Sequence, residues 1–404
     1  MNALDTHWPL SESNTAQPIP LSHGRVGAQA ALFITGFSTF LNLYATQPLL
    51  PQFRQTFQAS ELLVSLTVTA PVLAVAFMAP LIGLWADTLD RKRVIMTAML
   101  GLAAPTALAA TASGLGTLLV WRFLQGFAIP GVVAVVIAYI SEESPRQSVG
   151  STMATYVTGT IVGGFSGRFL MGWGAPIWGW RAIFALLGAA TLIGILVTGR
   201  FLPPSTHHVR PAQFPPPLQT LGRHLYNPQL LAIYLVGFNV LFCLTGTFTY
   251  VNFYLADRPF NLGPTALASI FAVYLTGVVV TPVAGVLLDR FGPRRTLIGA
   301  VSMGVLGILL TLIPHVPFVI AGLALGSSGT FVCQSAASSY VGKASGEARS
   351  SAAGLYVSFY YLGGCAGSIL PGLFWEKTGW LGCVALIVCI QSITILIARK
   401  LWRD

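Results

Sequence analysis

Charged side chains are scarce in this sequence. Asp, Glu, Lys and Arg together make up 8% of the 404 residues, whereas 54% of the residues are hydrophobic. An ordinary soluble domain carries about 25% charged residues, which cover its water-facing surface. This chain has too few charges for such a surface. Several of its runs, such as 26–50 and 62–84, contain roughly 20 residues without an ionised side chain, which is enough to cross a bilayer. The sequence therefore predicts an integral membrane protein.

Motifs for catalysis, metal binding and ATP hydrolysis are also missing from the sequence. The five cysteines lie in apolar runs without metal-ligand spacing, and the six histidines lie in tails or loops. The sequence contains no HExxH pair, no nucleophile–His–acid set and no GxxxxGK(S/T) loop. We therefore expect neither an enzyme nor an ATP-driven pump, and we predict no cofactor and no metal site.

The net charge of +10 is distributed unevenly along the chain. Lys and Arg are frequent in the even-numbered loops between the apolar runs, in the interior linker and near both termini. The odd-numbered loops hold only Arg54, Arg181, Arg258 and Lys377. Loops on the cytoplasmic side of a membrane carry such an excess of cations. The pattern predicts that both termini are cytoplasmic, and it argues against a nucleic-acid partner.

Twelve membrane-spanning helices are predicted, in two halves of six. The spans of the first half cover 26–50, 62–84, 94–112, 115–140, 149–173 and 180–202. Those of the second half cover 230–254, 265–287, 296–313, 317–341, 350–373 and 380–401. The predicted organisation is a cytoplasmic tail (1–25), a six-helix bundle (26–202), a cytoplasmic linker (203–229), a second six-helix bundle (230–401) and a short tail (402–404). The fold class is an all-α polytopic membrane protein.

An internal repeat relates the two halves. YVTGTIVGGFSG at 156–167 returns as YVSFYYLGGCAG at 356–367, and Gly179-Trp180 returns as Gly379-Trp380. GLWADTLDRKR at 83–93 returns as GVLLDRFGPRR at 285–295. All of these align at one offset or close to it. Parallel repeats of six helices are typical of a large class of secondary transporters.

The repeated loop resembles a signature of the major facilitator superfamily, and the chain is similar over 25–403 to the drug:proton antiporters of that family. Thr88 and Asp90 stand where the family usually has Arg and Gly, so the tight turn and one cation are expected to be missing from the first copy. The glycine of the first copy is expected to let spans 2 and 11 approach closely. The resemblance implies a conformational motif formed by Gly83, Asp87, Arg91 and Lys92 in the first copy, and by Gly285, Asp289, Arg290, Gly292 and Arg294 in the second.

Span 4 contains WRFLQG, which resembles the family's Arg-x-x-Gln-Gly signature. Arg122 would lie inside the membrane, where an unpaired charge is costly, and the matching position of the second half is Gly322. The resemblance implies that Arg122 and Gln125 take part in proton transfer. No span has a central carboxylate, so the acidic candidates for proton coupling are Glu61, Asp87 and Asp289 at span edges.

Span 5 has glycines at the spacing of the family's antiporter motif, namely Gly159, Gly163, Gly164 and Gly167. The family usually has Pro in place of Gly164, and Gly in place of Arg168. We expect the glycines to form a smooth packing face, and ordinary packing of small residues explains them almost as well. Arg168 is expected in the outer half of the membrane near Arg122, where two cations could attract an anionic substrate group.

The resemblance also implies a central cavity lined by spans 1, 4, 7 and 10, with span 11 beside it. Polar and aromatic side chains on these spans are the substrate candidates, namely Asn42, Tyr44, Gln47, Asn239, Phe242, Gln334, Tyr360 and Tyr361. A mostly apolar, aromatic cavity with a few amides is typical of sites for small amphipathic molecules.

The main hypothesis is a monomeric secondary transporter in a bacterial inner membrane. It would export small organic compounds, such as drugs or metabolites, in exchange for protons by alternating access. Its partners would be a small-molecule substrate, protons and the lipid bilayer. Two alternatives stay open: an importer or uncoupled facilitator of a small organic anion, and a sensor with a transporter fold.

Overall fold

The computed structural model describes residues 22–85, 90–144, 148–205, 225–344 and 349–402. These residues form helices joined by turns, and they contain no strand. The predicted tails, apart from a few residues, and most of the predicted linker lie outside the described residues. The all-α fold class is confirmed.

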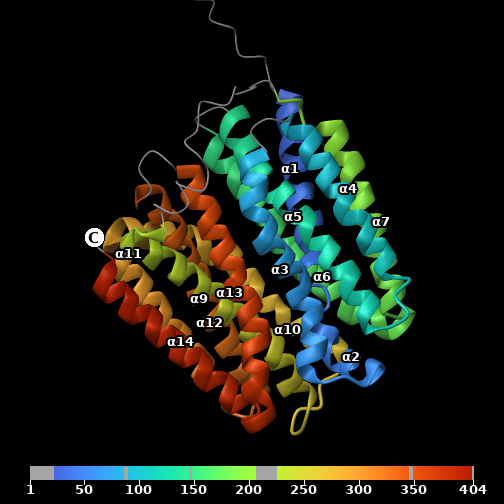
Figure 1. Cartoon of the computed structure of the whole chain (residues 1–404), viewed down its shortest axis with the longest axis vertical. Coiled ribbons are helices and arrows are strands. Elements are labelled where there is room, and N and C mark those ends of the chain that lie inside the picture. The colour runs from blue at the N-terminus through green and yellow to red at the C-terminus, as the bar shows by residue number, and fades with distance from the viewer. Residues whose placement is uncertain (1–21, 86–89, 145–147, 206–224, 345–348, 403–404) are drawn as a thin grey trace, which may run out of the picture.

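The first half of the chain runs from α1 to α7. Its elements are α1 (Ser22–Leu43), η1 (Gln47–Leu49), α2 (Leu50–Phe57), α3 (Glu61–Trp85), α4 (Arg91–Ala109), α5 (Leu115–Glu143), α6 (Val149–Trp178) and α7 (Trp180–Phe201). The second half comprises α9 (Pro228–Ala256), α10 (Pro264–Ile270), η3 (Phe271–Leu275), α11 (Thr276–Leu310), α12 (Val316–Ala344), α13 (Arg349–Thr378) and α14 (Trp380–Leu401). In Figure 1 the first half is blue to green and the second is yellow to red.

These helices account for the twelve predicted spans. Nine stretches of the described chain are long and apolar enough to cross a membrane, and one of them, Pro264–Leu310, covers 47 residues. That stretch contains two spans, because α11 breaks at Gly292, whose φ of 76° favours glycine. The helices α4 and α6 complete the set. The predicted first span also has a break, since α1 ends at Leu43 and η1 and α2 follow it.

The glycine repeat of the sequence is a repeated helix contact. Gly163 on α6 lies against the backbone carbonyl of Phe37 on α1, too close for any Cβ to fit. In the second half, Gly363 on α13 lies against the carbonyl of Phe238 on α9 in the same way. Glycine removes the side chain that would hold two such helices apart. Each half is therefore built around one pair of closely packed helices.

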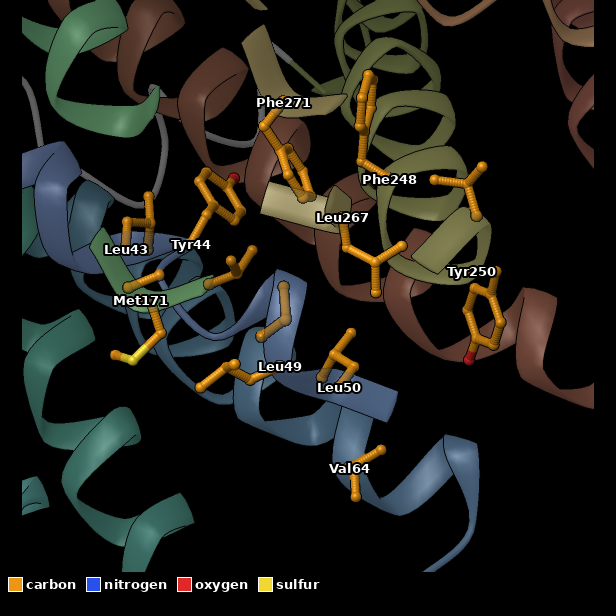
Figure 2. Packing of buried hydrophobic residues seen from close by; sticks show 14 of the residues in the cluster. Leu43, Tyr44, Leu49, Leu50, Val64, Met171, Phe248, Tyr250, Leu267 and Phe271 are labelled. Carbon is orange, nitrogen blue, oxygen red and sulfur yellow. The ribbon is translucent and has the colours of Figure 1, made fainter. Parts of the chain in front are cut away.

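The two halves meet at the end of the molecule that carries α2 and α10, called here the α2 end. The opposite end carries the start of α4 and is called here the basic end (Figure 1). The bend at Gly292 belongs to the basic end, because about one membrane length of α11 separates it from α10 and η3. Figure 2 shows side chains of both halves in one apolar cluster near α2, with Leu50 and Val64 from the first half and Leu267 and Phe271 from the second. Burial of apolar side chains thus joins the halves at this end.

The polar contacts between the halves have the same location. Among the described residues, every hydrogen bond that joins the halves lies on the α2 side of the molecule. The Thr69 and Ser368 hydroxyls are 2.8 Å apart, and the indole nitrogen of Trp173 donates to the Ser269 hydroxyl at 3.3 Å. At the basic end, a Cβ added to Gly285 would have no atom within 4 Å.

Candidate functional site

The centre of the candidate site is the break in the first span. The Gln47 N–H donates to the carbonyl of Tyr44 at 3.1 Å, so the Leu43 carbonyl does not receive its usual α-helical hydrogen bond. Pro48 follows at once, and a proline has no N–H with which to continue the helical pattern. The break thus leaves carbonyl oxygens at the end of α1 that need donors from elsewhere.

Arg122 on α5 supplies these donors, and its side chain is 0% exposed. Its Nη1 donates to the Asn42 carbonyl at 2.8 Å, and its Nη2 donates to the Leu43 carbonyl. Its Nε donates at 2.9 Å to the carbonyl of Thr67 on α3. That carbonyl is available because Pro71, four residues further on, has no N–H. A cation at the C-terminal end of α1 also matches the negative end of the helix dipole.

Gln125 extends this arrangement to a fourth helix. Its side-chain oxygen accepts from Arg122 Nη1, and its Nε2 donates to the hydroxyl of Thr106 on α4 at 2.8 Å. The sequence signature therefore places an arginine and a glutamine where they link α1, α3, α4 and α5. The geometry shows a structural role for both residues, and their predicted role in proton transfer stays a prediction.

Arg168 on α6 lies on the other side of the same break and is 2% exposed. Its Nε donates to the Gln47 side-chain oxygen at 2.7 Å, and its Nη1 donates to the Gly164 carbonyl at 2.7 Å. The guanidinium carbon lies 4.8 Å from the ring centroid of Tyr44. Arg122 and Arg168 thus bind successive parts of the segment that leads from α1 into η1.

Arg168 also contacts the second half of the protein. Its guanidinium carbon lies 4.9 Å from the ring centroid of Phe271 and 4.5 Å from that of Tyr274, both on η3. No carboxylate of the described chain lies within salt-bridge distance of it. Aromatic faces attract a cation, and they attract it more strongly away from water. Arg168 is therefore held between the two halves by rings instead of by an acid.

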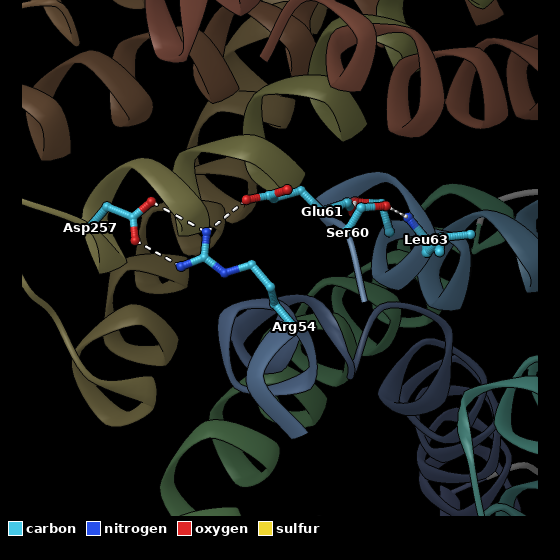
Figure 3. A network of polar contacts seen from close by, with 6 residues as sticks. Arg54, Ser60, Glu61, Leu63 and Asp257 are labelled. Atoms are coloured by element: carbon cyan, nitrogen blue, oxygen red, sulfur yellow. Dashed lines mark hydrogen bonds and ion pairs between the residues drawn. The ribbon is translucent and has the colours of Figure 1, made fainter. Parts of the chain in front are cut away.

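An ion-pair cluster joins the halves at the α2 end. Arg54 on α2 donates to Glu61, the first residue of α3, at 2.7 Å, and to Asp257, which follows α9, at 2.9 Å (Figure 3). Glu61 was predicted as a candidate acid. Asp257 and Arg54 were not, because their pairing joins positions 203 residues apart. The only sequence signal for Arg54 is its position in an odd-numbered loop, where Lys and Arg are scarce.

The predicted amides are turned toward their own halves. The Asn42 side chain donates to the hydroxyl of Thr191 on α7 at 3.0 Å, and the Asn239 side chain donates to that of Thr394 on α14 at 2.8 Å. In each half, an amide of the first helix thus bonds to a threonine of the last helix. Gln47 binds Arg168, as described above.

The remaining substrate candidates belong largely to the second half. The Tyr356 hydroxyl donates to the side-chain oxygen of Gln334 at 3.0 Å. The rings of Tyr360 and Tyr361 are perpendicular, with centroids 5.5 Å apart, and Tyr361 is buried. Phe242 is wholly buried in the core and packs against the glycine face of α13. The three tyrosines of α13 thus form a chain of ring contacts, with Gln334 of α12 bound to the first of them.

The predicted loop motifs hold the ends of their halves together. The side chain of Lys92 donates to the Gly199 carbonyl near the end of α7 at 2.8 Å, and Arg294 donates to the Arg399 carbonyl near the end of α14 at 2.6 Å. Arg91 pairs with Glu142 at 2.9 Å. One cation per half thus binds the C-terminal carbonyls of the last helix, as the helix dipole favours.

The two copies of the motif differ at one matching position that the structure describes. Asp90 has a φ of −59°, and its side chain accepts from the Arg93 N–H to cap α4. Gly292, at the matching position, makes its turn with a positive φ. Asp289 and Arg290 are exposed. Asp87 lies outside the described residues, and so does the packing around Gly83.

The predicted glycines of span 5 have two different neighbourhoods. Gly159, Gly163 and Gly167 lie against the backbone of α1. Gly164 faces another way, since a Cβ there would be 3.4 Å from Nη1 of Arg168. The helix α6 therefore carries both the glycines that pack against α1 and the glycine that lies beside Arg168.

Two six-helix halves that meet around a broken first helix, with a buried arginine between them, are the architecture of a polytopic membrane transporter. The profile of the Major Facilitator Superfamily matches 32–368 of the sequence, and a second match covers 256–404. The chain belongs to the Major Facilitator Superfamily.

Relatives and a solved structure agree with this membership. Inner membrane transport protein YnfM of Escherichia coli (strain K12) is 31% identical over 379 residues, which cover 92% of this chain and 90% of YnfM. Uncharacterized MFS-type transporter YybF of Bacillus subtilis (strain 168) is 30% identical over 381 residues, 93% of each chain. A bacterial homologue of the human lysosomal transporter Spinster shares the fold, with a TM-score of 0.75, 16% identity and coverage of 95% and 99% of the two chains.

Proposed function

We propose that this transporter exports small organic compounds in exchange for protons, by alternating access of its two halves. The observation that carries the proposal is the one-sided contact between them. Among the described residues, the apolar cluster and the hydrogen bonds that join the halves lie toward the α2 end, and Gly285 at the basic end faces open space. Such a molecule can alternate by closing at one end and opening at the other.

The distribution of cations gives this conformation a direction. The basic end carries the loops that the positive-inside rule assigns to the cytoplasm. With that orientation, in a bacterial inner membrane with both termini cytoplasmic, the structure is closed to the outside and open to the inside. The tails, linker and bundles would have the boundaries proposed from the sequence, and the chain would work as a monomer.

Proton coupling is assigned to the acids at the edges of the spans. Glu61 is the best placed of these, since it shares Arg54 with Asp257 of the other half. Protonation of an acid in this cluster would weaken a contact between the halves, and so favour opening at the α2 end. Asp87 and Asp289 remain candidates at the basic end, with Arg122 and Gln125 as the positioning residues of the broken helix.

The direct test is transport in everted membrane vesicles after a compound screen in efflux-deficient cells that express the protein. We expect uptake of the screened compound only when a pH gradient is imposed. Equal uptake with and without the gradient would exclude proton antiport. Vesicles with Glu61→Gln should lose the dependence on the gradient. Glu376→Gln is the matched control, because Glu376 lies at the end of α13 and forms no ion pair with the described residues.

A second candidate function is import or uncoupled passage of a small organic anion. Arg168 favours it, because this buried cation has no acid beside it among the described residues. Accumulation of an anion in intact cells on expression of the protein would support this candidate over export. If expression of the protein changes neither the uptake nor the export of any screened compound, the sensor hypothesis would be favoured.

A further inference from the structure

The two buried arginines of the site differ in how fully their donors are used. Arg122 donates to three backbone carbonyls and one amide oxygen. Arg168 donates to Gln47 and to the carbonyl of Gly164, through Nε and Nη1. Within the described chain its Nη2 amino group has no hydrogen-bond acceptor. Arg122 is thus committed to the backbone, and Arg168 keeps donors for another group.

A further unused donor lies beside Arg168. The Nε2 of Gln47 is buried and has no hydrogen-bond partner among the described residues. The Gln47 oxygen accepts from Arg168, which fixes the amide with its NH2 group free. A positive charge with several free N–H groups and no acid is complementary to an anion. A carboxylate fits best, because it accepts two parallel hydrogen bonds from a guanidinium.

The cover over this arginine comes from the opposite half. Phe271 and Tyr274 belong to η3, whereas Arg168, Gln47 and Tyr44 belong to the first half. The rings of η3 lie on the guanidinium in the present conformation, which is closed at the α2 end. Any motion that separates the halves at this end removes these two rings and leaves Arg168 and Gln47 facing the opening.

We propose that Arg168 and Gln47 bind the carboxylate group of a small organic anion, at a site that becomes accessible when the halves part at the α2 end. The inference rests on the second candidate function, passage of a small organic anion, and narrows its substrate class to compounds that carry a carboxylate. The η3 rings bind the Arg168 guanidinium in the closed conformation, and the anion binds it in the open one. Binding of the anion therefore favours the conformation that is open at the α2 end.

The test measures binding to the purified full-length protein without any gradient. Acetate, benzoate and succinate are each compared with their neutral amides, by the shift in thermal unfolding as the compound is titrated. At least one of the acids is expected to bind about tenfold more tightly than its amide, as one charge-assisted pair allows. Arg168→Gln should remove this preference, and Arg168→Lys should retain only part of it, because lysine lacks the paired geometry.

Arg181→Gln is the matched control. Arg181 also stacks on an aromatic ring, 4.2 Å from the Trp180 centroid, and also donates to a backbone carbonyl, that of Ala112. Arg181 belongs to the first half, and its contacts with Trp180 and Ala112 do not involve η3. The preference for acid over amide should be unchanged in this variant.

The cover gives a second and opposite expectation. Tyr274→Leu removes a competing ring and should tighten carboxylate binding by about threefold, the worth of one cation–π contact. Phe248→Leu is its control. The centroids of the Phe248 and Tyr274 rings are 4.6 Å apart, but the Phe248 ring makes no cation–π contact with Arg168. Weaker binding in Tyr274→Leu would contradict the proposed competition.

The proposal is overturned if none of the three acids binds better than its amide, or if Arg168→Gln keeps the preference. These results are independent of transport. Carboxylate binding without flux of any compound in proteoliposomes would contradict the transport function alone. Gradient-dependent export by a protein without carboxylate preference would contradict this site alone.

Discussion

At the scale of single residues, the main finding is that Arg122 is paired with backbone oxygens and not with an acid. Two proline positions explain it. Pro48 helps to end α1 early, and Pro71 frees the Thr67 carbonyl on α3. The burial of Arg122 is predictable from the sequence, since it stands alone in an apolar run. Its partners are not, because a proline in the sequence marks a carbonyl that loses its helical donor but does not show which distant side chain reaches that carbonyl.

Arg122→Ala is expected to abolish transport while the protein still inserts into the membrane. The variant leaves buried carbonyls on α1 and α3 without donors, which costs about 1–3 kcal/mol for each such group. Substrate flux and the amount of protein in the membrane are the two measurements. Arg181→Ala, which also removes bonds to a backbone carbonyl, is the control. Normal flux in Arg122→Ala would remove this residue from the mechanism.

At the scale of helices, the glycines define which helices pack as close pairs. A Cβ at Gly163 would overlap the Phe37 carbonyl, and one at Gly363 would overlap that of Phe238. The sequence predicts this packing face because small residues recur on one side of a helix. It does not predict that Gly164 faces Arg168 instead, since neighbouring glycines look alike in a sequence.

Gly163→Ala is therefore expected to destabilise the protein by about 1–3 kcal/mol, the usual cost of overpacking. Gly326→Ala is the matched control, because a Cβ at Gly326 meets no atom within 4 Å. Alanine also favours the helix there by up to about 1 kcal/mol relative to glycine. Thermal unfolding in detergent measures both. Equal unfolding temperatures would show that α1 and α6 adjust to an added methyl group.

The turn before α4 carries a different expectation. Asp87→Asn should impair transport more than Asp90→Asn. Asp90 caps α4 through the Arg93 N–H at 2.9 Å, and asparagine caps a helix about as well as aspartate. Asp87 is the acid of the family signature, so the loss of its charge should matter. Transport rates at matched protein levels decide the question, and equal effects would reduce the loop to a topological anchor.

At the scale of the whole molecule, the twelve spans and the two halves follow from the sequence, whereas the way the halves meet does not. Span length and the repeat at 156–167 and 356–367 are patterns of the sequence itself, and they do not depend on the conformation of the protein. The pairing of Arg54 with Asp257, or of Arg168 with η3, depends on how two bundles are placed relative to each other. Hydropathy and periodicity carry no information on that placement.

Joining the halves at the α2 end should stop transport. The Thr69 and Ser368 hydroxyls are 2.8 Å apart, so cysteines at both positions are close enough for a disulfide. We expect oxidised Thr69→Cys/Ser368→Cys protein to lose flux and to regain it on reduction. Each single cysteine variant is the control. Unchanged flux in the cross-linked protein would mean that the α2 end need not open.

The cluster of Arg54, Glu61 and Asp257 has a consequence for the medium in which the protein works. The side chains are 26%, 22% and 45% exposed, so solvent and dissolved ions reach them. Ion pairs of this kind contribute only about 0–1 kcal/mol and weaken as ionic strength rises, because the Debye length falls to about 8 Å at 0.15 M. The cluster lies at the α2 end of the molecule. In the orientation proposed above, salt on the outer face of the membrane should thus set how readily the transporter opens there, and salt on the inner face should not.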